Sequence, residues 1–250
     1  MSTKTILITG ASSGLGEEMA RQFAGRGHDL ALCARRTDRL EALRADLRTR
    51  HPGRRVEVRA LDVNDHDQVF EVFRAFKADF GTLDRVVVNA GLGKGAPLGT
   101  GGFAANRETA MTNFIGALAQ TEAAMEIFRE QGSGHLVMIS SMSAMRGMPK
   151  SATTYAATKA GVAHLAEGLR AELMGTPIKV SVVYPGYIRS EMNERVKNAP
   201  FMVSTGKGVH AMVEAIEKER PSARIPSWPW KPLGFAMKHL PLPVVRRLLG

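Results

Sequence analysis

The chain has 250 residues, of which 44% are hydrophobic and 23% are charged, and its formal net charge is +10. These fractions are those of an ordinary globular protein, and the apolar stretches are too short and too interrupted to cross a bilayer as a helix. The composition excludes an integral membrane protein. Because basic residues are interleaved with acidic ones through most of the chain, we also expect no nucleic-acid partner.

The first residues, MSTKTILITGASSG, pass from a short polar start directly into an apolar run and a glycine turn. A secretory signal has a longer apolar region and a small-residue cleavage site, so we expect a cytoplasmic protein. The single cysteine, Cys33, lies in the apolar run DLALCA, where a buried and reduced thiol is expected. The histidines show no ligand spacing, and we expect no metal site.

Short apolar or β-branched runs alternate with longer amphipathic stretches from Thr5 onward. The runs predict strands at residues 5–9, 29–34, 56–61, 84–90, 134–141 and 178–185. The other stretches predict a helix over residues 14–27, a second that follows the strand at 29–34 and ends at about residue 50, and a third that begins at residue 65. Two more helices are predicted over about residues 111–131 and 152–174. Asp65 and Gln68 have the spacing of a capping box at the start of the third helix.

This alternation indicates the fold class. Such apolar strands need cover on both faces, and strands separated by helices need right-handed crossovers. We predict an α/β fold, a single Rossmann-like doubly wound parallel sheet of about seven strands flanked by helices on both faces, with a C-terminal extension. Residues 1–220 would form one dinucleotide-binding and catalytic domain with a substrate lid at about 190–205, and residues 221–250 a basic, apolar tail. The ligand is expected beyond the carboxyl ends of the strands.

A glycine-rich turn, TGASSGLG at residues 9–16, joins the first strand to the first helix. Glycine lets the backbone turn tightly and approach a pyrophosphate, while the helix N-terminus offers free amides to the anion. The spacing matches T-G-x-x-x-G-x-G rather than G-x-G-x-x-G, and three glycines alone would also suit a plain tight turn. The residues expected to bind a dinucleotide here are Gly10, Ser12, Ser13, Gly14, Leu15 and Gly16.

The second strand ends in CARRTD, where an NAD site would carry Asp or Glu against the ribose 2′-hydroxyl. Ala34 removes that acid, and Arg35 and Arg36 supply guanidinium donors suited to a 2′-phosphate. The sequence therefore favours NADP(H) over NAD(H). Two arginines in a loop can also be solvated surface, and this interpretation stays open for one of them.

Small and polar residues follow the next two strands. Asp62 can accept a hydrogen bond from an adenine amino group, as can the backbone of Val63, although Asp62 could equally cap the following helix. Asn89, Ala90 and Gly91 end the fourth strand, and their size allows a flat cofactor to pass over the strand end.

The stretch TYAATKA at residues 154–160 sets Tyr155 and Lys159 one helical turn apart on one face. A cation at about 4 Å is worth roughly 4 kcal/mol at an effective dielectric constant near 20, so Lys159 is expected to lower the phenol pKa of Tyr155 by units. A phenol poised in this way can donate or accept a proton while a hydride moves to or from a carbonyl carbon.

Serines close the fifth strand in MISSMSA, at Ser140, Ser141 and Ser143. One of these hydroxyls can bond the substrate oxygen and stabilise the charge that develops on it. Serine is also common at strand ends for ordinary turn reasons, so position alone does not select one.

Taken in order, these motifs resemble the short-chain dehydrogenase/reductase family, from Thr5 to about Met192. The motifs are TGASSGLG, LDV, VNAG, MTNFIG, ISS, YAATK and YPGYIRSEM. The resemblance implies Tyr155 as catalytic acid/base, Lys159 as the group that lowers its pKa and holds the nicotinamide ribose, and a serine that binds the reacting oxygen. It implies that Asn113 holds a water that relays protons to Lys159, and that the protein is a homodimer or homotetramer. The residues that it implies near the nicotinamide are Pro185, Gly186, Ile188 and Ser190.

Two positions depart from the family's pattern. Met142 stands thirteen residues before the tyrosine, where the family usually has its serine. We choose Ser141 over Ser143, because ISS aligns with the strand end and the loop MPKSATTY looks one residue longer than usual. Ser13 stands where many NADP-preferring members carry Arg or Lys, so the two arginines would hold the 2′-phosphate without that help.

The last two segments bear on the substrate and on partners. The lid contains Met192, Phe201, Met202 and Val203, which favour a lipophilic carbonyl or alcohol, although an ordinary packed helix would have the same composition. The tail combines aromatic residues with only cationic charges, which suits an anionic membrane surface or packing against a partner subunit. Its prolines prevent one long helix.

The sequence thus predicts an NADP(H)-dependent oxidoreductase that interconverts a ketone or aldehyde with an alcohol by hydride transfer, with a tyrosine as acid/base. The alternative is a catalytically silent NADP-binding regulator, or a membrane-surface scaffold, with the same fold. Such regulators typically lose the tyrosine or the lysine, and both are present here as Tyr155 and Lys159.

Overall fold

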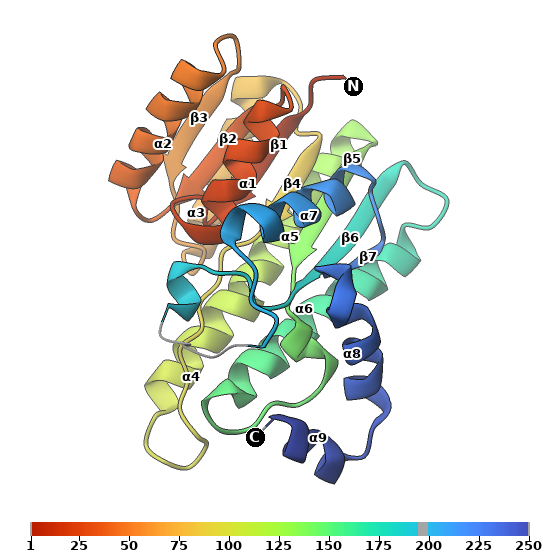
Figure 1. The fold of residues 1–250 in the computed structure, drawn as a ribbon. Coiled ribbons are helices and arrows are strands. Elements are labelled where there is room, and N and C mark those ends of the chain that lie inside the picture. The colour runs from red at the N-terminus through yellow and green to blue at the C-terminus, as the bar shows by residue number, and fades with distance from the viewer. Residues whose placement is uncertain (1, 195–199, 250) are drawn as a thin grey trace.

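A parallel sheet forms the centre of the protein (Figure 1). A computed structural model describes residues 2–194 and 200–249, and within them the sheet has seven strands in the order β3-β2-β1-β4-β5-β6-β7. The strands are β1 (Thr5–Thr9), β2 (Asp29–Ala34), β3 (Val56–Ala60), β4 (Arg85–Val88), β5 (Gly134–Ile139), β6 (Ile178–Pro185) and β7 (Ser222–Ile225). All neighbouring strands pair in parallel, which confirms the predicted doubly wound fold.

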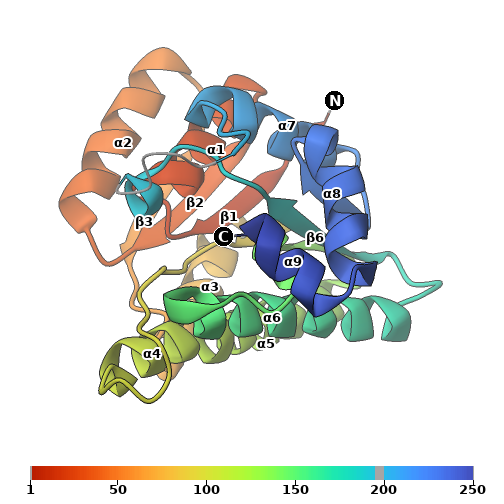
Figure 2. The same cartoon turned by 60° about the horizontal axis from the view of Figure 1, so that its bottom comes forward.

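Helices cover both faces of the sheet (Figure 2). The helices are α1 (Gly14–Gly25), α2 (Thr37–Arg50), α3 (His66–Phe80), α4 (Phe103–Ala110), α5 (Gly116–Gln131), α6 (Thr153–Glu172), α7 (Thr205–Glu217), α8 (Ser227–His239) and α9 (Leu242–Leu249). Side chains alternate along a strand, so Leu7 packs with α3, α5 and α6, whereas Ile6 and Ile8 pack with α1, α2 and α7. Both faces of the sheet are therefore apolar, as the sequence predicts.

The helix expected at about 111–131 is interrupted. Residues Met111–Ile115 form one π-helical stretch between α4 and α5, and Asn113 lies within it. π-Helical turns are rare and occur frequently at functional sites. A π-helical turn has no simple period of apolar residues, so the apolar pattern of the sequence did not predict the stretch Met111–Ile115.

The capping box predicted at the start of α3 is only half formed. The carboxylate of Asp65 accepts from the backbone N–H of Gln68, as expected of an N-cap. The Gln68 side chain, however, accepts from the backbone N–H of Asp62 at 2.8 Å. Gln68 therefore ties the helix to the end of β3, and Asp62 does not cap the helix.

The segment 221–250 begins inside the sheet. Its first residues form β7, which pairs with β6 through Val182 opposite Ser222. The chain then forms α8 and α9, which Pro241 separates, in agreement with the expectation that prolines prevent one long helix. Across residues 2–194 and 200–249, no helix combines the length and the apolar character that a membrane span needs.

A buried charged cluster lies at the amino ends of β4 and β5. The guanidinium of Arg85, which is fully buried, donates to His135 Nδ1 at 2.9 Å and to Glu217 at 2.6 Å. Because Arg85 can only donate, His135 Nδ1 is the acceptor and its Nε2–H points to the Ser181 hydroxyl at 2.7 Å. Glu217 also lies 3.3 Å from His28. This cluster joins the end of α7 to three strands.

Candidate active site

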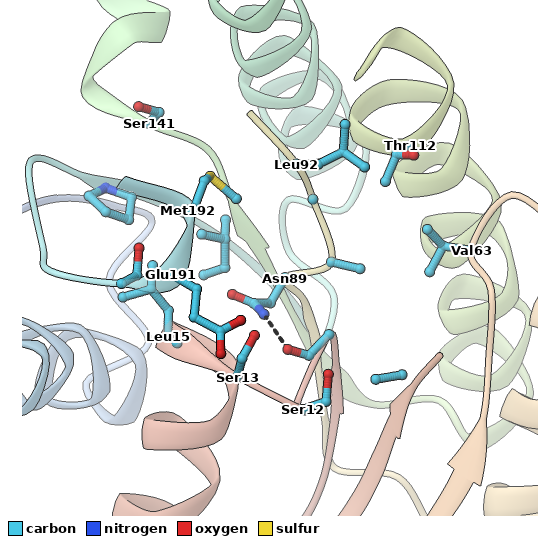
Figure 3. A pocket seen from close by; sticks show the side chains of 18 of the residues that line it. Ser12, Ser13, Leu15, Val63, Asn89, Leu92, Thr112, Ser141, Glu191 and Met192 are labelled. Carbon is cyan, nitrogen blue, oxygen red and sulfur yellow. Dashed lines mark hydrogen bonds between the residues drawn. The ribbon is translucent and has the colours of Figure 1, made fainter. Parts of the chain in front are cut away.

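A cleft lies at the carboxyl ends of the strands, as the doubly wound fold predicts (Figure 3). The predicted residues that line it are Gly10, Ser12, Ser13, Gly14, Leu15, Arg35, Arg36, Asp62, Val63, Asn89, Ala90, Gly91, Ser141, Tyr155, Lys159, Pro185, Gly186, Ile188 and Ser190. The predicted residues Gly16 and Asn113 belong to the described part of the chain, but they are buried and do not line this cleft. The described residues contain no cluster of three or more side chains able to hold a metal ion.

Two positions in the glycine turn between β1 and α1, Gly10 and Gly16, have no room for a side chain. Gly10 has a φ of +64°, and a Cβ at this position would lie 2.9 Å from the Cα of Ala90. A Cβ at Gly16 would overlap the Gly10 carbonyl and lie 2.7 Å from the Asn89 amide. The glycines therefore let the start of α1 approach the end of β4, so that the helix N-terminus borders the cleft.

Thr9 holds the ends of β1 and β4 together. Its hydroxyl accepts from the backbone N–H groups of Asn89 and Ala90, both at 3.0 Å. The Asn89 side chain donates to the Thr9 carbonyl at 2.9 Å. Asn89 thus acts at the cleft by positioning the strand ends. Thr9 was not among the predicted cofactor-binding residues, although it is the first residue of the glycine motif.

Arg36 reaches back to the glycine turn. Its Nε donates to the Ser12 hydroxyl at 3.2 Å, and its Nη2 donates to the Ser13 hydroxyl. Its Nη1 donates to Glu191 at 3.1 Å, from the segment that follows β6. These contacts gather a guanidinium and two hydroxyls at one end of the cleft.

Arg35 has a different environment. Its side chain is 63% exposed, and its guanidinium lies 4.0 Å from the carboxylate of Asp62. Asp62 also accepts from the backbone N–H of Asn64 at 3.0 Å and from the Asn64 side chain at 3.1 Å. Of the two arginines, Arg35 thus fits the interpretation of solvated surface better than Arg36 does.

The opposite wall of the cleft carries Tyr155 and Lys159, one turn apart on α6. The Lys159 side chain is buried, and its Nζ donates to the Ile139 carbonyl at 2.9 Å. Nζ lies 5.9 Å from the centroid of the Tyr155 ring. The small residues of the YAATK motif therefore let a lysine pass under the tyrosine to the end of β5.

The pKa values of this pair differ from the expectation. Burial raises the pKa of the Tyr155 phenol above its usual value, and the Ser141 hydroxyl lowers it in part. Burial lowers the pKa of Lys159 to about 8. The prediction that the lysine lowers the phenol pKa by units is therefore wrong for the protein chain by itself. The physical reason is that desolvation penalises the phenolate, and that Nζ is directed to a carbonyl rather than to the phenol oxygen.

The serines at the end of β5 have distinct contacts. Ser143 donates to the Ser141 hydroxyl at 3.0 Å, and Ser141 also accepts from the Ser143 backbone N–H at 3.2 Å. Ser140 donates to the Lys159 carbonyl at 2.7 Å and so holds α6 to the strand end. Met142 is buried in the core, away from the cleft surface. Ser140 and Ser141 both line the cleft, but the Ser140 hydroxyl is bonded to the Lys159 carbonyl, whereas the Ser141 hydroxyl influences Tyr155.

Asn113 lies behind Gly91. Its side chain accepts from the backbone N–H of Leu92 and donates to the Leu92 carbonyl, both at 2.8 Å. A Cβ at Gly91 would lie 3.1 Å from Asn113 Oδ1 and 3.5 Å from Lys159 Nζ. Asn113 and Lys159 therefore flank one small residue, and the asparagine amide is bonded to the loop that follows β4.

The segment after β6 forms the third side of the cleft. A Cβ at Gly186 would overlap the buried indole of Trp230 from α8, and Ile188 pairs with Val203 in a short bridge. Ser190 begins a short helical turn over Glu191–Asn193. The predicted lid at about 190–205 includes residues 195–199, which lie outside the described residues.

The structure adds cleft residues that the sequence analysis did not select. These include Leu92, Thr112, Glu191, Met192 and Asn193. Met192 was selected only as part of the lid, and a Cβ at Gly93 would lie 3.2 Å from its Cγ. The Met192 side chain thus reaches from this segment to the loop after β4. Figure 3 shows Met192 and Glu191 among the residues that line the cleft. The motif YPGYIRSEM contains Glu191 and Met192, but no local pattern indicates what they meet.

Comparison with known proteins agrees with this geometry. The family model for short chain dehydrogenase matches residues 4–200, which is most of the chain. The chain belongs to the short-chain dehydrogenase/reductase family. It is accordingly a dehydrogenase/reductase of the type that acts on alcohols and carbonyl compounds.

Two relatives of this short-chain dehydrogenase match over nearly the whole chain. It is 52% identical to an uncharacterized oxidoreductase of Mycobacterium tuberculosis, over 97% of this chain and 96% of that protein. It is 37% identical to an uncharacterized oxidoreductase of Myxococcus xanthus, over 92% of this chain and 89% of that protein. A solved structure of a short-chain dehydrogenase from Sphingobium yanoikuyae in complex with NADPH has a TM-score of 0.82 and 28% identity, over 96% of this chain and 97% of that one.

Proposed function

We propose that this protein is an NADP(H)-dependent oxidoreductase of the cytoplasm that interconverts a lipophilic ketone or aldehyde with an alcohol. The observation that carries the proposal is the shared cleft of Ser141, Tyr155 and Lys159 with the glycine turn and Arg36. One end of the cleft thus offers donors for phosphate, and the other offers proton-transfer groups.

The residues present fit a phosphorylated dinucleotide. Without side chains, Gly10 and Gly16 let the start of α1 pack close to the end of β4, and the free amides of the helix N-terminus can then face a pyrophosphate in the cleft. Arg36, supported by the hydroxyls of Ser12 and Ser13, suits a 2′-phosphate. The relative from Sphingobium yanoikuyae, whose structure was solved with NADPH, supports the same choice.

A bound nicotinamide would supply or accept the hydride, and the chain's own groups would move the proton. Tyr155 would donate its phenol proton to the carbonyl oxygen during reduction. A phenol is protonated at neutral pH, and burial raises the pKa of this one further. Ser141 would donate a hydrogen bond to the same oxygen. Lys159, whose pKa of about 8 keeps much of it charged at neutral pH, would hold the nicotinamide ribose.

The apolar residues of the cleft support a lipophilic substrate. Leu92 and Met192 line the cleft close to Gly91 and Ser190. Next to the cleft residue Gly186, Trp230 contacts Tyr187 and Phe201, at centroid distances of 5.9 and 6.1 Å. Such apolar and aromatic surface binds carbon chains or rings while a few polar groups orient the reacting oxygen.

The proposal is tested with the purified protein and NADPH, with a panel of ketones and aldehydes of graded chain length. We expect NADPH consumption that increases with chain length until the cleft is filled. Tight NADPH binding without turnover of any panel member would instead support the catalytically silent regulator. Absence of both binding and turnover would overturn the cofactor assignment as well.

Replacing Arg36 by alanine is expected to weaken NADPH binding by about ten- to a hundredfold, because a charge-assisted hydrogen bond contributes about 1.5–3 kcal/mol. The Kd for NADH should change by less than about twofold, since NADH lacks the 2′-phosphate. Arg35→Ala serves as the matched control and should have a smaller effect, because Arg35 is mostly exposed. Fluorescence titration of both cofactors measures these affinities. An unchanged preference for NADPH in Arg36→Ala would contradict the assignment.

Contact with an anionic membrane through α8 is a second proposal, and the exposed side chains of that helix support it. Trp228 and Phe235 of α8 are 79% and 68% exposed, and Leu242 at the start of α9 is 59% exposed. Lys231 and Lys238 of α8 are exposed as well. Exposed aromatic and cationic groups together suit the surface of an anionic bilayer. A second copy of this helix would instead meet it with like charges.

Vesicle flotation of the full chain tests this contact. Binding to phosphatidylserine vesicles should exceed binding to neutral phosphatidylcholine vesicles, and Lys231→Glu with Lys238→Glu should reduce it by about tenfold or more, since each lysine contributes about 1 kcal/mol. Point substitutions are needed because truncation at 221 would remove β7 from the sheet. Equal flotation with both vesicle types would end the proposal.

We also propose that the protein is a homodimer or homotetramer, and sedimentation velocity would measure its oligomeric state.

A further inference from the structure

Glu191 places a carboxylate at the end of the cleft that holds Arg36. Glu191 belongs to the short helical turn after β6, and its Oε2 accepts from Arg36 Nη1 at 3.1 Å. Its Oε1 pairs with Arg39, near the start of α2. Glu191 and Arg36 are 155 positions apart in the sequence, so this contact bridges two separate walls of the cleft. In Figure 3 the Glu191 side chain extends toward Ser13.

Arg36 has one anionic partner in the structure, Glu191, and a bound 2′-phosphate would be a second. Arg36 uses Nε and Nη2 for the hydroxyls of Ser12 and Ser13, and its remaining contact goes to the carboxylate. Under the proposed function, a 2′-phosphate would approach this guanidinium and these hydroxyls. Two anions at one guanidinium repel each other, so the phosphate and the Glu191 carboxylate compete for Arg36.

We propose that Glu191 is an internal competitor of the cofactor 2′-phosphate and thereby sets the preference between NADP(H) and NAD(H). Without cofactor, its carboxylate neutralises Arg36 and Arg39. NADP(H) must displace this carboxylate, whereas NAD(H) presents a 2′-hydroxyl that can donate a hydrogen bond to it. Glu191 therefore narrows the preference for NADP(H) that Arg36 creates. This inference rests on the proposed NADP(H) site.

An alternative is that the ion pairs only fasten the segment after β6 to α2. The carboxylate and both arginines are partly exposed, and exposed ion pairs contribute little to stability. A purely structural tie would affect both cofactors alike when it is removed. Competition affects NADPH and leaves NADH nearly unchanged, so the two cofactors distinguish these roles.

The experiment compares wild type with Glu191→Gln, which removes the charge and keeps the shape. Kd values for NADPH and NADH are measured by fluorescence titration at low ionic strength. We expect Glu191→Gln to bind NADPH about three- to tenfold more tightly, with the NADH affinity unchanged or slightly weaker. The matched control is Glu194→Gln, an exposed glutamate of the same segment, which should leave both affinities within twofold of wild type.

A double substitution locates the effect. When Arg36 is already alanine, Glu191→Gln should change the NADPH affinity by less than about twofold, because the guanidinium for which the two anions compete is gone while Arg39 still pairs with Glu191. Equal tightening of both cofactors, or unchanged or weaker NADPH binding by Glu191→Gln, would overturn the competition. If wild type shows no preference for NADPH and Arg36→Ala changes nothing, the NADP(H) site itself fails. That outcome is separate from a failure of Glu191 alone.

Discussion

Tyr155→Phe is expected to lower kcat for carbonyl reduction by about 100- to 10,000-fold, which is the range that a positioned general acid contributes. The phenylalanine keeps the ring and removes only the proton donor. NADPH affinity should stay within about twofold of wild type, because the donors for the pyrophosphate and 2′-phosphate come from the other end of the cleft. Steady-state kinetics with the best carbonyl compound and a separate NADPH titration measure the two quantities.

Tyr184→Phe is the matched control, because Tyr184 lies on β6 and packs in the core outside the cleft lining. It should retain near-normal turnover. The serines provide a second comparison. Ser141→Ala should lower kcat more than Ser143→Ala, because Ser141 lines the cleft, whereas Ser143 only donates a hydrogen bond to the Ser141 hydroxyl. Equal turnover by Tyr155→Phe and wild type would remove the tyrosine from the mechanism and leave the family assignment intact.

Arg85→Met is expected to reduce the free energy of unfolding by about 3–5 kcal/mol, the usual cost of removing one partner of a buried ion pair. The substitution leaves the Glu217 carboxylate and His135 Nδ1 without their donor. Urea unfolding followed by circular dichroism measures the change. Arg74→Met is the control, because Arg74 pairs with Glu126 on the surface and should contribute less than about 1 kcal/mol. Similar losses in both variants would contradict a special role for the buried cluster.

The same cluster makes stability depend on pH. Burial alone would raise the pKa of Glu217, but His28 and Arg85 outweigh it and hold this pKa at about 2. Burial lowers the pKa of His135 to about 3. Both folded values lie below those of the unfolded chain, so this stabilisation is present above about pH 6.5 and decreases as the pH falls toward 2. In Arg85→Met the part of this loss below about pH 4.5 should shrink, because Glu217 then lacks the Arg85 guanidinium, which together with His28 holds its pKa low.

The fold could be predicted largely from the sequence because its signals are local. The bounds of β1, β2 and β6 agree with the apolar runs at residues 5–9, 29–34 and 178–185. An apolar run with β-branched residues favours a buried strand wherever it packs, and the intervening helices then impose parallel order. The helical spacing of Tyr155 and Lys159 likewise follows from nearest neighbours on one helix.

Other features were decided by packing between distant elements. The expected tail supplies β7 because its residues meet the open edge of β6, and nothing in SARI alone distinguishes an edge strand from a loop. Of two adjacent arginines, Arg36 turns to Ser12 and Ser13 while Arg35 stays exposed. A side chain's direction depends on what surrounds it, and the sequence carries no local signal for that.

By itself, the sequence determined the parallel sheet, the glycine turn, and the helix that carries a tyrosine and a lysine on one face. Only the tertiary structure decided that burial raises the Tyr155 pKa, that Arg85 lies in a buried charged cluster, and that Glu191 meets Arg36. The physical reason is one of range. Periodicity and turn chemistry act between neighbours, whereas desolvation and ion pairing depend on residues brought together from far apart in the chain.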